Sequence, residues 1–222
     1  MFVSEKPGRA TFPNKGPIFY YITDRSQLSG ISLIACIRRA LDWGVDCIQI
    51  REKDLSDRAL YDLTCDAVAF ARKTKCKVLV NGRADIALAA GAAGVHLPSA
   101  GLRASEIRSC FPPNLTLGMS VHSIREARSR YCIGTDYLIL GHVFPTQSKS
   151  EFGLPLGLNF LQKFCAAVSL PVLGLGGIRP ESIQSVLDAG AIGVAGISLF
   201  QNDAEFRRLV LTQRRQDAKP AF

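Results

Sequence analysis

Two glycine-rich segments near the end of the chain have the composition of a phosphate-binding site. LGLGGI contains Gly176 and Gly177, and GVAGIS contains Gly196, Ile197 and Ser198. Each segment belongs to a short apolar run that predicts a buried strand. Glycine lets an anion approach main-chain N–H groups closely, and the last two units of many α/β barrels hold a phosphate in this way. We therefore expect these five residues to bind a phosphate group, with plain tight turns as the alternative.

Cationic and amide side chains follow other apolar runs of the chain. Carboxylates are scarce at these places, so the set favours an anionic, phosphorylated substrate. The loop from Pro145 to Leu156 is long enough to act as a lid. For the cations, ordinary solvated surface charge is the alternative. Besides the glycine-rich segments, the residues expected to contact the substrate are Arg51, Lys53, Asn81, Ser120, His142, Thr146, Ser148 and Lys149.

His122 is the residue that we expect to transfer protons. An imidazole can both give and take a proton near neutral pH, and His122 directly follows the apolar run LTLGMSV. A surface histidine at a helix start is the alternative. His96 is expected to pack inside the fold, and His142 is a weaker catalytic candidate than His122.

Apolar runs and amphipathic segments alternate along the chain and predict eight parallel strands, each followed by a helix. Eight such repeats imply closure into a (β/α)₈ TIM barrel. An open doubly wound sheet is the rival fold, which is disfavoured because no Gly-x-Gly-x-x-Gly motif follows the first strand. The strands are expected over residues 18–23, 47–50, 77–81, 94–97, 115–119 and 137–141, from 171, and over 193–197.

Length and composition fit a single barrel domain. The chain has 222 residues, of which 47% are hydrophobic. We expect a flexible N-terminal tail over residues 1–16, the barrel over 17–215 and a C-terminal tail over 216–222. The opening segment lacks the apolar run of a signal peptide, and the uncharged run from Ile86 to Leu102 is broken by glycines and Pro98. No membrane association is expected.

Charge and cysteine usage limit the partners and the compartment. The formal net charge of +8 suits a small anionic substrate. No basic stripe interleaved with aromatic residues is found, so nucleic-acid binding is not expected. The seven cysteines are scattered without a Cys-x-x-Cys pair, which argues against disulfides and a zinc site and for a reducing cytoplasm. We also expect a homo-oligomer, either a dimer or a tetramer.

Eight sequence segments resemble the thiamine-phosphate synthase and thiazole tautomerase superfamily. They occur in the order of that superfamily between Ile18 and Phe200. The resemblance implies the same barrel fold and a phosphorylated thiazole as the small-molecule partner. The segments are YYITD, QIREK, NGRADIAL, GVHLPS, GMSVHS, DYLILGHVFPTQSK, LGLGGI and GVAGIS.

The resemblance implies two different chemistries. Synthases of the superfamily join hydroxymethylpyrimidine pyrophosphate to thiazole phosphate and hold Mg²⁺ with two aspartates. This chain has Gly82 and Gly101 at those places, and glycine supplies no side-chain oxygen to a metal. The tautomerase branch aromatises carboxythiazole phosphate by proton transfer without a metal, and its motif histidine matches His122.

On these grounds we expect a thiazole tautomerase, an isomerase of thiamine biosynthesis that needs no metal or other cofactor. Arg51, Lys53 and the segment from Thr146 to Lys149 nevertheless resemble the pyrophosphate-binding positions of the synthases. A thiamine-phosphate synthase, which is a transferase, is therefore the alternative. A non-catalytic regulator that binds thiazole phosphate is the third hypothesis.

Overall fold

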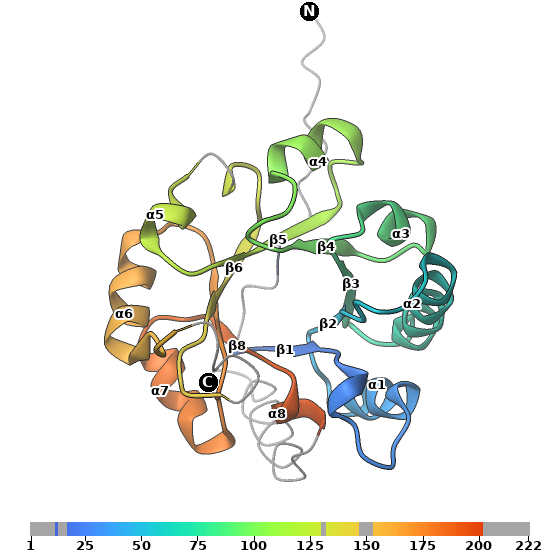
Figure 1. Ribbon diagram of the computed structural model, residues 1–222, viewed down its shortest axis with the longest axis horizontal. Helices are drawn as coiled ribbons and strands as arrows, with labels where there is room; N and C mark the ends of the chain where they lie inside the picture. Colours follow the sequence, from blue (N-terminus) through green and yellow to red (C-terminus); the bar gives the residue numbers. More distant parts are fainter. Residues whose placement is uncertain (1–11, 13–16, 130–131, 147–152, 202–222) are drawn as a thin grey trace, which may run out of the picture.

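A computed structural model describes residues 12, 17–129, 132–146 and 153–201 and shows a closed barrel of eight parallel strands (Figure 1). Neighbours in sequence pair side by side, and β1 pairs with β8 to close the ring. The predicted (β/α)₈ barrel is confirmed, and the open-sheet alternative is wrong. The strands are β1 (Ile18–Ile22), β2 (Cys47–Ile50), β3 (Lys77–Asn81), β4 (Gly94–Leu97), β5 (Thr116–Val121), β6 (Tyr137–Gly141), β7 (Val172–Leu175) and β8 (Gly193–Gly196).

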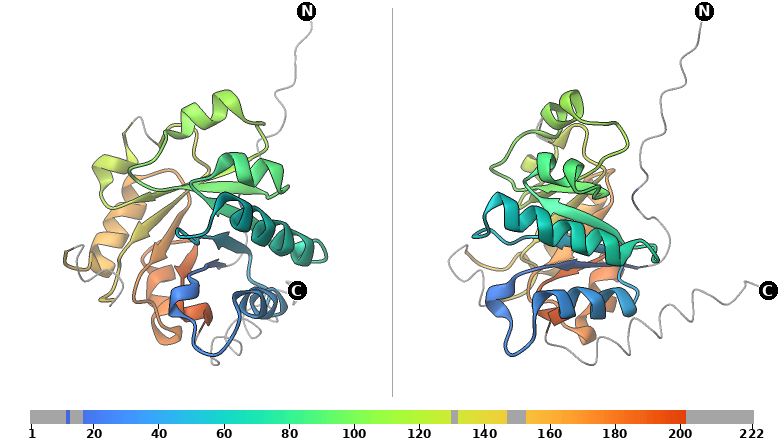
Figure 2. Two further views of the ribbon diagram at one scale, coloured as in Figure 1. Left: turned by 45° about the vertical axis from the view of Figure 1, so that its right-hand side comes forward. Right: turned by 90° about the vertical axis from the view of Figure 1, so that its right-hand side faces the viewer.

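Helices surround the barrel on its outside, as the side views in Figure 2 show. In the described part of the chain, no helix is both long enough and apolar enough to cross a membrane. The helices are α1 (Leu33–Asp42), α2 (Asp57–Ala71), α3 (Ala84–Ala89), α4 (Ala104–Cys110), α5 (Ile124–Ala127), α6 (Gly157–Ala167), α7 (Ile183–Asp188) and α8 (Ser198–Gln201), with 3₁₀ turns η1 (Arg25–Gln27) and η4 (Pro180–Ser182).

Serine residues fix where three of these helices begin. The side chains of Ser32, Ser56 and Ser123 each accept a hydrogen bond from the backbone N–H three residues later. Such a cap satisfies a donor that the first turn of a helix would leave unpaired, and it contributes about 1 kcal/mol. Because the caps end the loops that follow β1, β2 and β5, they also set the length of those loops.

The main hydrophobic core lies between the outer face of the barrel and the helices. Ile48 and Ile50 of β2, and Leu138 and Leu140 of β6, are fully buried in it. Each such side chain contributes roughly 1.5–3 kcal/mol through burial. This outer layer supplies hydrophobic stability, so the side chains that point into the barrel can include polar ones.

The interior of the barrel is partly aromatic and is closed by a residue from the N-terminal segment. The Phe12 ring stacks on the Tyr137 ring at a centroid distance of 4.1 Å and is 6% exposed. Tyr137 has room because residue 118 is glycine: a Cβ at Gly118 would lie 2.0 Å from Tyr137 Cζ. The rest of the predicted tail over 1–16, and all of the one over 216–222, lie outside the described residues.

Candidate functional site

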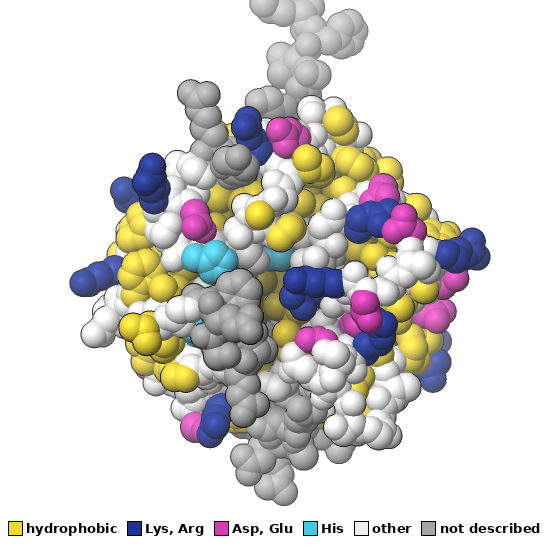
Figure 3. Space-filling model, in the orientation of Figure 1, with side chains coloured by type: hydrophobic (Ala, Val, Ile, Leu, Met, Phe, Trp, Pro, Cys, Tyr) yellow, Lys and Arg dark blue, Asp and Glu magenta, His cyan; other side chains and the backbone are white. Residues whose placement is uncertain are grey.

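The carboxyl ends of the strands surround a cavity of about 400 Å³ at the mouth of the barrel. In a (β/α)₈ barrel, the loops that connect each strand to the following helix lie at this end, and active sites are usually located there. Basic and histidine side chains are visible beside the centre of one face of the molecule (Figure 3). The mouth cavity brings together the predicted site residues Arg51, Lys53, Asn81, Ser120 and His122.

A second cavity, of about 570 Å³, adjoins the first, and we call it the phosphate cup. Gln27, Leu175 and Ile197 line both cavities. A ligand in the phosphate cup would therefore lie next to a ligand in the mouth. The predicted site residues that line the cup are Thr146, Gly176, Gly177, Gly196, Ile197 and Ser198.

The backbone of the cup can be built only from glycine at two positions. Gly176 and Gly177 have φ angles of +100° and +63°. A Cβ would lie 2.4 Å from His142 Cβ in the first case and 2.4 Å from the Pro145 carbonyl oxygen in the second. Within the described residues neither glycine N–H has a hydrogen-bond partner. Both donors are therefore available to a ligand, and free backbone N–H groups of this kind are what an anion site requires.

Arg51 and Lys53 are the two cations of the mouth, and Glu52, which lies between them in the sequence, does not neutralise them. Glu52 is buried, and its Oε2 accepts hydrogen bonds from the Arg25 backbone N–H at 3.1 Å and from Arg25 Nη1 at 3.3 Å. Neither Arg51 nor Lys53 forms an ion pair with any described residue. Their charge is thus available to a ligand.

Three residues that sequence reasoning did not assign to the site also line the cavities: Asp24, Gln27 and Arg179. Burial opposes ionisation of Asp24, but hydrogen bonds from Ser26 and Gln27 outweigh it and lower the pKa of the carboxyl. Arg179 adds a cation to the phosphate cup. Asp24 ends the first apolar run and Arg179 directly follows LGLGGI, so their positions in the sequence could have indicated both.

His96 forms part of the floor of the mouth and lies inside the barrel, as expected. Its Nε2 is 2.9 Å from Ser120 Oγ, and its Nδ1 is 3.2 Å from the Tyr137 hydroxyl. Burial, assisted by the positive charge of Arg51, lowers the pKa of His96 to about 3. The ring is therefore neutral at physiological pH.

The other two histidines differ in access. His122 is exposed at the mouth, and its Nδ1–H donates to the Gly141 carbonyl at 2.7 Å, which leaves Nε2 for a ligand. His142 is buried beneath Gly176 and lines neither cavity, so the structure does not bring this predicted contact into the site. Ser148 and Lys149 lie outside the described residues.

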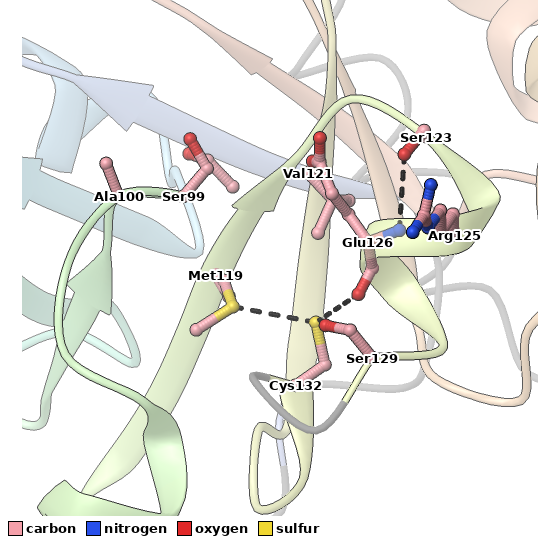
Figure 4. A pocket seen from close by; sticks show the side chains of 10 residues that line it. Ser99, Ala100, Met119, Val121, Ser123, Arg125, Glu126, Ser129 and Cys132 are labelled. Carbon is pink, nitrogen blue, oxygen red and sulfur yellow. Dashed lines mark hydrogen bonds between the residues drawn. The ribbon is translucent and has the colours of Figure 1, made fainter.

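A third cavity, of about 420 Å³, lies beside the mouth (Figure 4). Its lining includes Met119 and Cys132, and Cys132 Sγ is 3.5 Å from Met119 Sδ. It shares Ser99 and Ser120 with the mouth cavity. None of the described cations that we predicted to bind anions lines it, so we assign no phosphate group to it.

The described residues do not fit the magnesium site that the resemblance implies for synthases. Gly82 and Gly101 occupy the two aspartate places, and a Cβ at Gly101 would lie only 3.0 Å from Pro98 Cγ. Within the described part of the chain, no group of three or more His, Cys, Asp or Glu residues could hold a metal ion. Mg²⁺ requires several oxygen ligands in a near-octahedral array, and these side chains do not supply them.

We expect the ligand-free protein to show no Mg²⁺ binding by titration calorimetry below about 1 mM, because Gly82 and Gly101 supply no side-chain oxygen at the two places where the synthases have aspartates. A Gly82→Asp/Gly101→Asp variant is the matched control and should gain measurable binding. Micromolar binding by the parent protein would contradict this prediction and would indicate a different set of ligands.

The known proteins that this chain resembles agree with one another in name. A family model described as thiamine monophosphate synthase matches residues 19–200. A thiamine-phosphate synthase of Roseiflexus castenholzii is 40% identical over 187 residues, covering 84% of this chain and 82% of that protein. One of Desulfitobacterium hafniense is 38% identical, covering 83% and 90%. Thiamine phosphate pyrophosphorylase from Pyrococcus furiosus has a TM-score of 0.77 at 32% identity, covering 90% and 95%.

These relatives overturn the predicted thiazole tautomerase. They carry the names of transferases and not of isomerases, so the comparisons favour the synthase alternative. The prediction was wrong because it relied on two glycines and on the motif around His122. A histidine at a barrel mouth can bind an anion as well as move a proton. The match over residues 19–200 and the identity with whole relatives place this chain in the thiamine monophosphate synthase family.

Proposed function

We propose that this chain is a thiamine-phosphate synthase, a transferase that joins hydroxymethylpyrimidine pyrophosphate to thiazole phosphate. The observation that carries the proposal is the direct contact between the phosphate cup and the cation-lined mouth. Two anionic substrates need two anion sites that hold their reacting atoms together. The names of the relatives support the same reaction.

The transfer forms a C–N bond between the thiazole nitrogen and the methylene carbon of the pyrimidine substrate. The C–O bond to pyrophosphate breaks, and pyrophosphate leaves with the electron pair. No proton moves in this step, so His122 is not needed as an acid–base residue. We assign it instead to the binding of the leaving group: Nδ1–H is occupied by the Gly141 carbonyl, and in the imidazolium form Nε2–H would donate to pyrophosphate at the mouth.

Positioning and charge stabilisation are the tasks left to the described residues. The backbone N–H groups of Gly176 and Gly177 would hold the thiazole phosphate. Arg51 and Lys53 would stabilise the negative charge that grows on the departing pyrophosphate. Ser148 and Lys149 stay predicted contacts of the pyrophosphate.

The test is to supply both substrates and to measure pyrophosphate release together with thiamine phosphate formation. Stoichiometric appearance of both products is the expected result. Binding of thiazole phosphate without release of pyrophosphate would instead support the non-catalytic alternative, which the glycines at positions 82 and 101 favour.

We expect Arg51→Met to lower kcat/KM for the pyrophosphate substrate by about 10- to 100-fold, since a charged hydrogen bond contributes roughly 1.5–3 kcal/mol. Affinity for thiazole phosphate should change less than about twofold, because Arg51 does not line the cup. Arg58→Met is the control: Arg58 is exposed on α2 and pairs with Asp62 at 3.1 Å. Equal losses in both variants would remove Arg51 from the proposed site.

A further inference from the structure

Six inward-facing polar side chains, one from each of β1 to β6, form a continuous series of hydrogen bonds inside the barrel. We call them the interior chain. Both of its ends line the mouth cavity. In order, its members are Asn81, Gln49, Tyr20, Tyr137, His96 and Ser120. The successive distances are 3.0, 3.1, 2.7, 3.2 and 2.9 Å.

The interior chain has a direction that begins at the Gln49 amide. Gln49 Nε2–H donates to Asn81 Oδ1, which turns Gln49 Oε1 toward Tyr20. An amide oxygen can only accept, so the Tyr20 hydroxyl donates to it. A hydroxyl has a single proton, and the Tyr20 oxygen must therefore accept from the hydroxyl of Tyr137.

The same reasoning extends from Tyr137 to the mouth. Because the Tyr137 proton is directed at Tyr20, its oxygen accepts from His96 Nδ1–H. A neutral imidazole carries only one N–H, so His96 Nε2 has a lone pair. That lone pair accepts the Ser120 O–H. The oxygen of Ser120 is then left with lone pairs and no proton to offer.

We infer that the interior chain presents Ser120 to the mouth as a hydrogen-bond acceptor, with Tyr20 and Tyr137 as the positioning residues that set this polarity. Neither tyrosine lines the mouth cavity. The ligand atom that meets Ser120 must accordingly be a donor, such as an amino group. Ser120 thus acts as a specificity-determining residue whose preference is set by two phenols deeper in the barrel.

Burial isolates the middle of the interior chain from water. Tyr20 and Tyr137 are fully buried, and His96 is 2% exposed. Phe12 covers the Tyr137 ring, and Gly118 leaves the space into which that ring fits. A buried donor or acceptor without a partner costs about 1–3 kcal/mol. Each buried member therefore keeps the donor or acceptor role that pairs with its neighbours.

The class of substrate that meets Ser120 rests on the proposed function, whereas the direction of the hydrogen bonds does not. A pyrimidine ring with an amino substituent can donate to Ser120. A ring with only an ether oxygen at the same place would put the lone pairs of that oxygen against those of Ser120 Oγ, which is a repulsive contact. The interior chain therefore favours an aminopyrimidine over its alkoxy analogue.

The direct test is ¹⁵N NMR of the ligand-free full chain labelled at histidine, at neutral pH. The spectrum should show His96 protonated on Nδ1, with Nε2 at the position of an unprotonated nitrogen. His96→Gln assigns the signal by removing it. A His96 ring protonated on Nε2 in the parent would overturn the inference, because the series would then run in the opposite direction.

Two variants test the positioning residues without touching the mouth. Tyr137→Phe removes the acceptor of His96 Nδ1–H, and a buried unpaired N–H is rarer than an unpaired acceptor. His96 should therefore shift its proton to Nε2. Tyr20→Phe frees the Tyr137 proton for His96 Nδ1 and should cause the same shift. Should one variant fail to fold, as judged by circular dichroism, the other still decides the matter.

Tyr21→Phe is the matched control for both tyrosine variants. Tyr21 is adjacent to Tyr20 in β1, but its hydroxyl has no hydrogen-bond partner in the part of the chain that the structure describes. It should leave the proton of His96 on Nδ1. An unchanged proton position in Tyr137→Phe and Tyr20→Phe would refute the role of the tyrosines.

Ligand preference gives a second readout, with 4-aminopyrimidine and 4-methoxypyrimidine as probes. The parent should bind the amino probe about three- to tenfold more tightly, as one neutral hydrogen bond allows, and Tyr137→Phe should lose that preference. Equal preference in both proteins would contradict the inference.

Failure of the proposed function can be told apart from failure of this inference. A protein without transferase activity whose His96 is protonated on Nδ1 would contradict the proposed function but support the direction of the interior chain.

Discussion

Gly177→Val is expected to lower transfer activity by about 10³–10⁴-fold while the barrel remains folded. The substitution places a Cβ 2.4 Å from the Pro145 carbonyl oxygen and 2.8 Å from that of Phe144. The cup must deform, which withdraws backbone donors from the phosphate. Losing two charge-assisted hydrogen bonds, at roughly 1.5–3 kcal/mol each, corresponds to about this factor. Thiazole phosphate affinity, measured by calorimetry, should fall in parallel with turnover.

Gly91→Val is the control for backbone strain. Gly91 has a similar φ, +68°, but no atom lies within 4 Å of its hypothetical Cβ, and it lines neither cavity of the site. It should cost about 1–3 kcal/mol of stability and leave activity unchanged. A Gly177→Val protein that binds thiazole phosphate as the parent does would place the phosphate elsewhere.

Acidification should destabilise the protein through His96. The folded state keeps this ring neutral down to about pH 3, whereas an unfolded chain protonates it near pH 6.5. Between these values the unfolded state binds more protons, so the free energy of unfolding falls as pH falls. At 1.36 kcal/mol per pH unit, the loss is about 3 kcal/mol at pH 4.5 and on the order of 4–5 kcal/mol near pH 3.

Urea unfolding of the parent and of His96→Gln, from pH 7 to pH 4, measures this contribution. Carboxylates such as Asp24 also lose favourable interactions in acid, but they do so in both proteins. The stability difference between the two should therefore narrow as the pH falls. Parallel curves would show that His96 does not carry the pH dependence.

The fold could be predicted from the sequence because most strands are apolar runs with clear ends. The expected bounds of 47–50, 77–81, 94–97 and 137–141 agree with β2, β3, β4 and β6. The strand expected over 115–119 is instead Thr116–Val121. Ser120 is polar but points into the barrel, so hydrophobicity alone ends the strand too early.

The backbone conformation of the candidate site was predictable where glycine decides it. Gly176 and Gly177 have positive φ and line one cavity, as their spacing in the sequence indicates, whereas the phosphate that they would bind stays a prediction. The position of His142 depends on packing beneath Gly176, which no local pattern contains. The bond between Tyr20 and Tyr137 joins residues 117 positions apart. Only closure of the barrel brings them together, so sequence reasoning missed the interior chain.

The close approach of Gly118 to the Tyr137 ring limits the order in which these positions can change during evolution. Any side chain at position 118 needs volume that the phenol now occupies, since a Cβ would lie 2.0 Å from Cζ and 2.3 Å from the hydroxyl oxygen. A mutational path must therefore shrink residue 137 before, or together with, enlarging residue 118. A library that varies one position at a time will find position 118 intolerant, whereas a library that pairs it with small residues at position 137 will recover folded barrels.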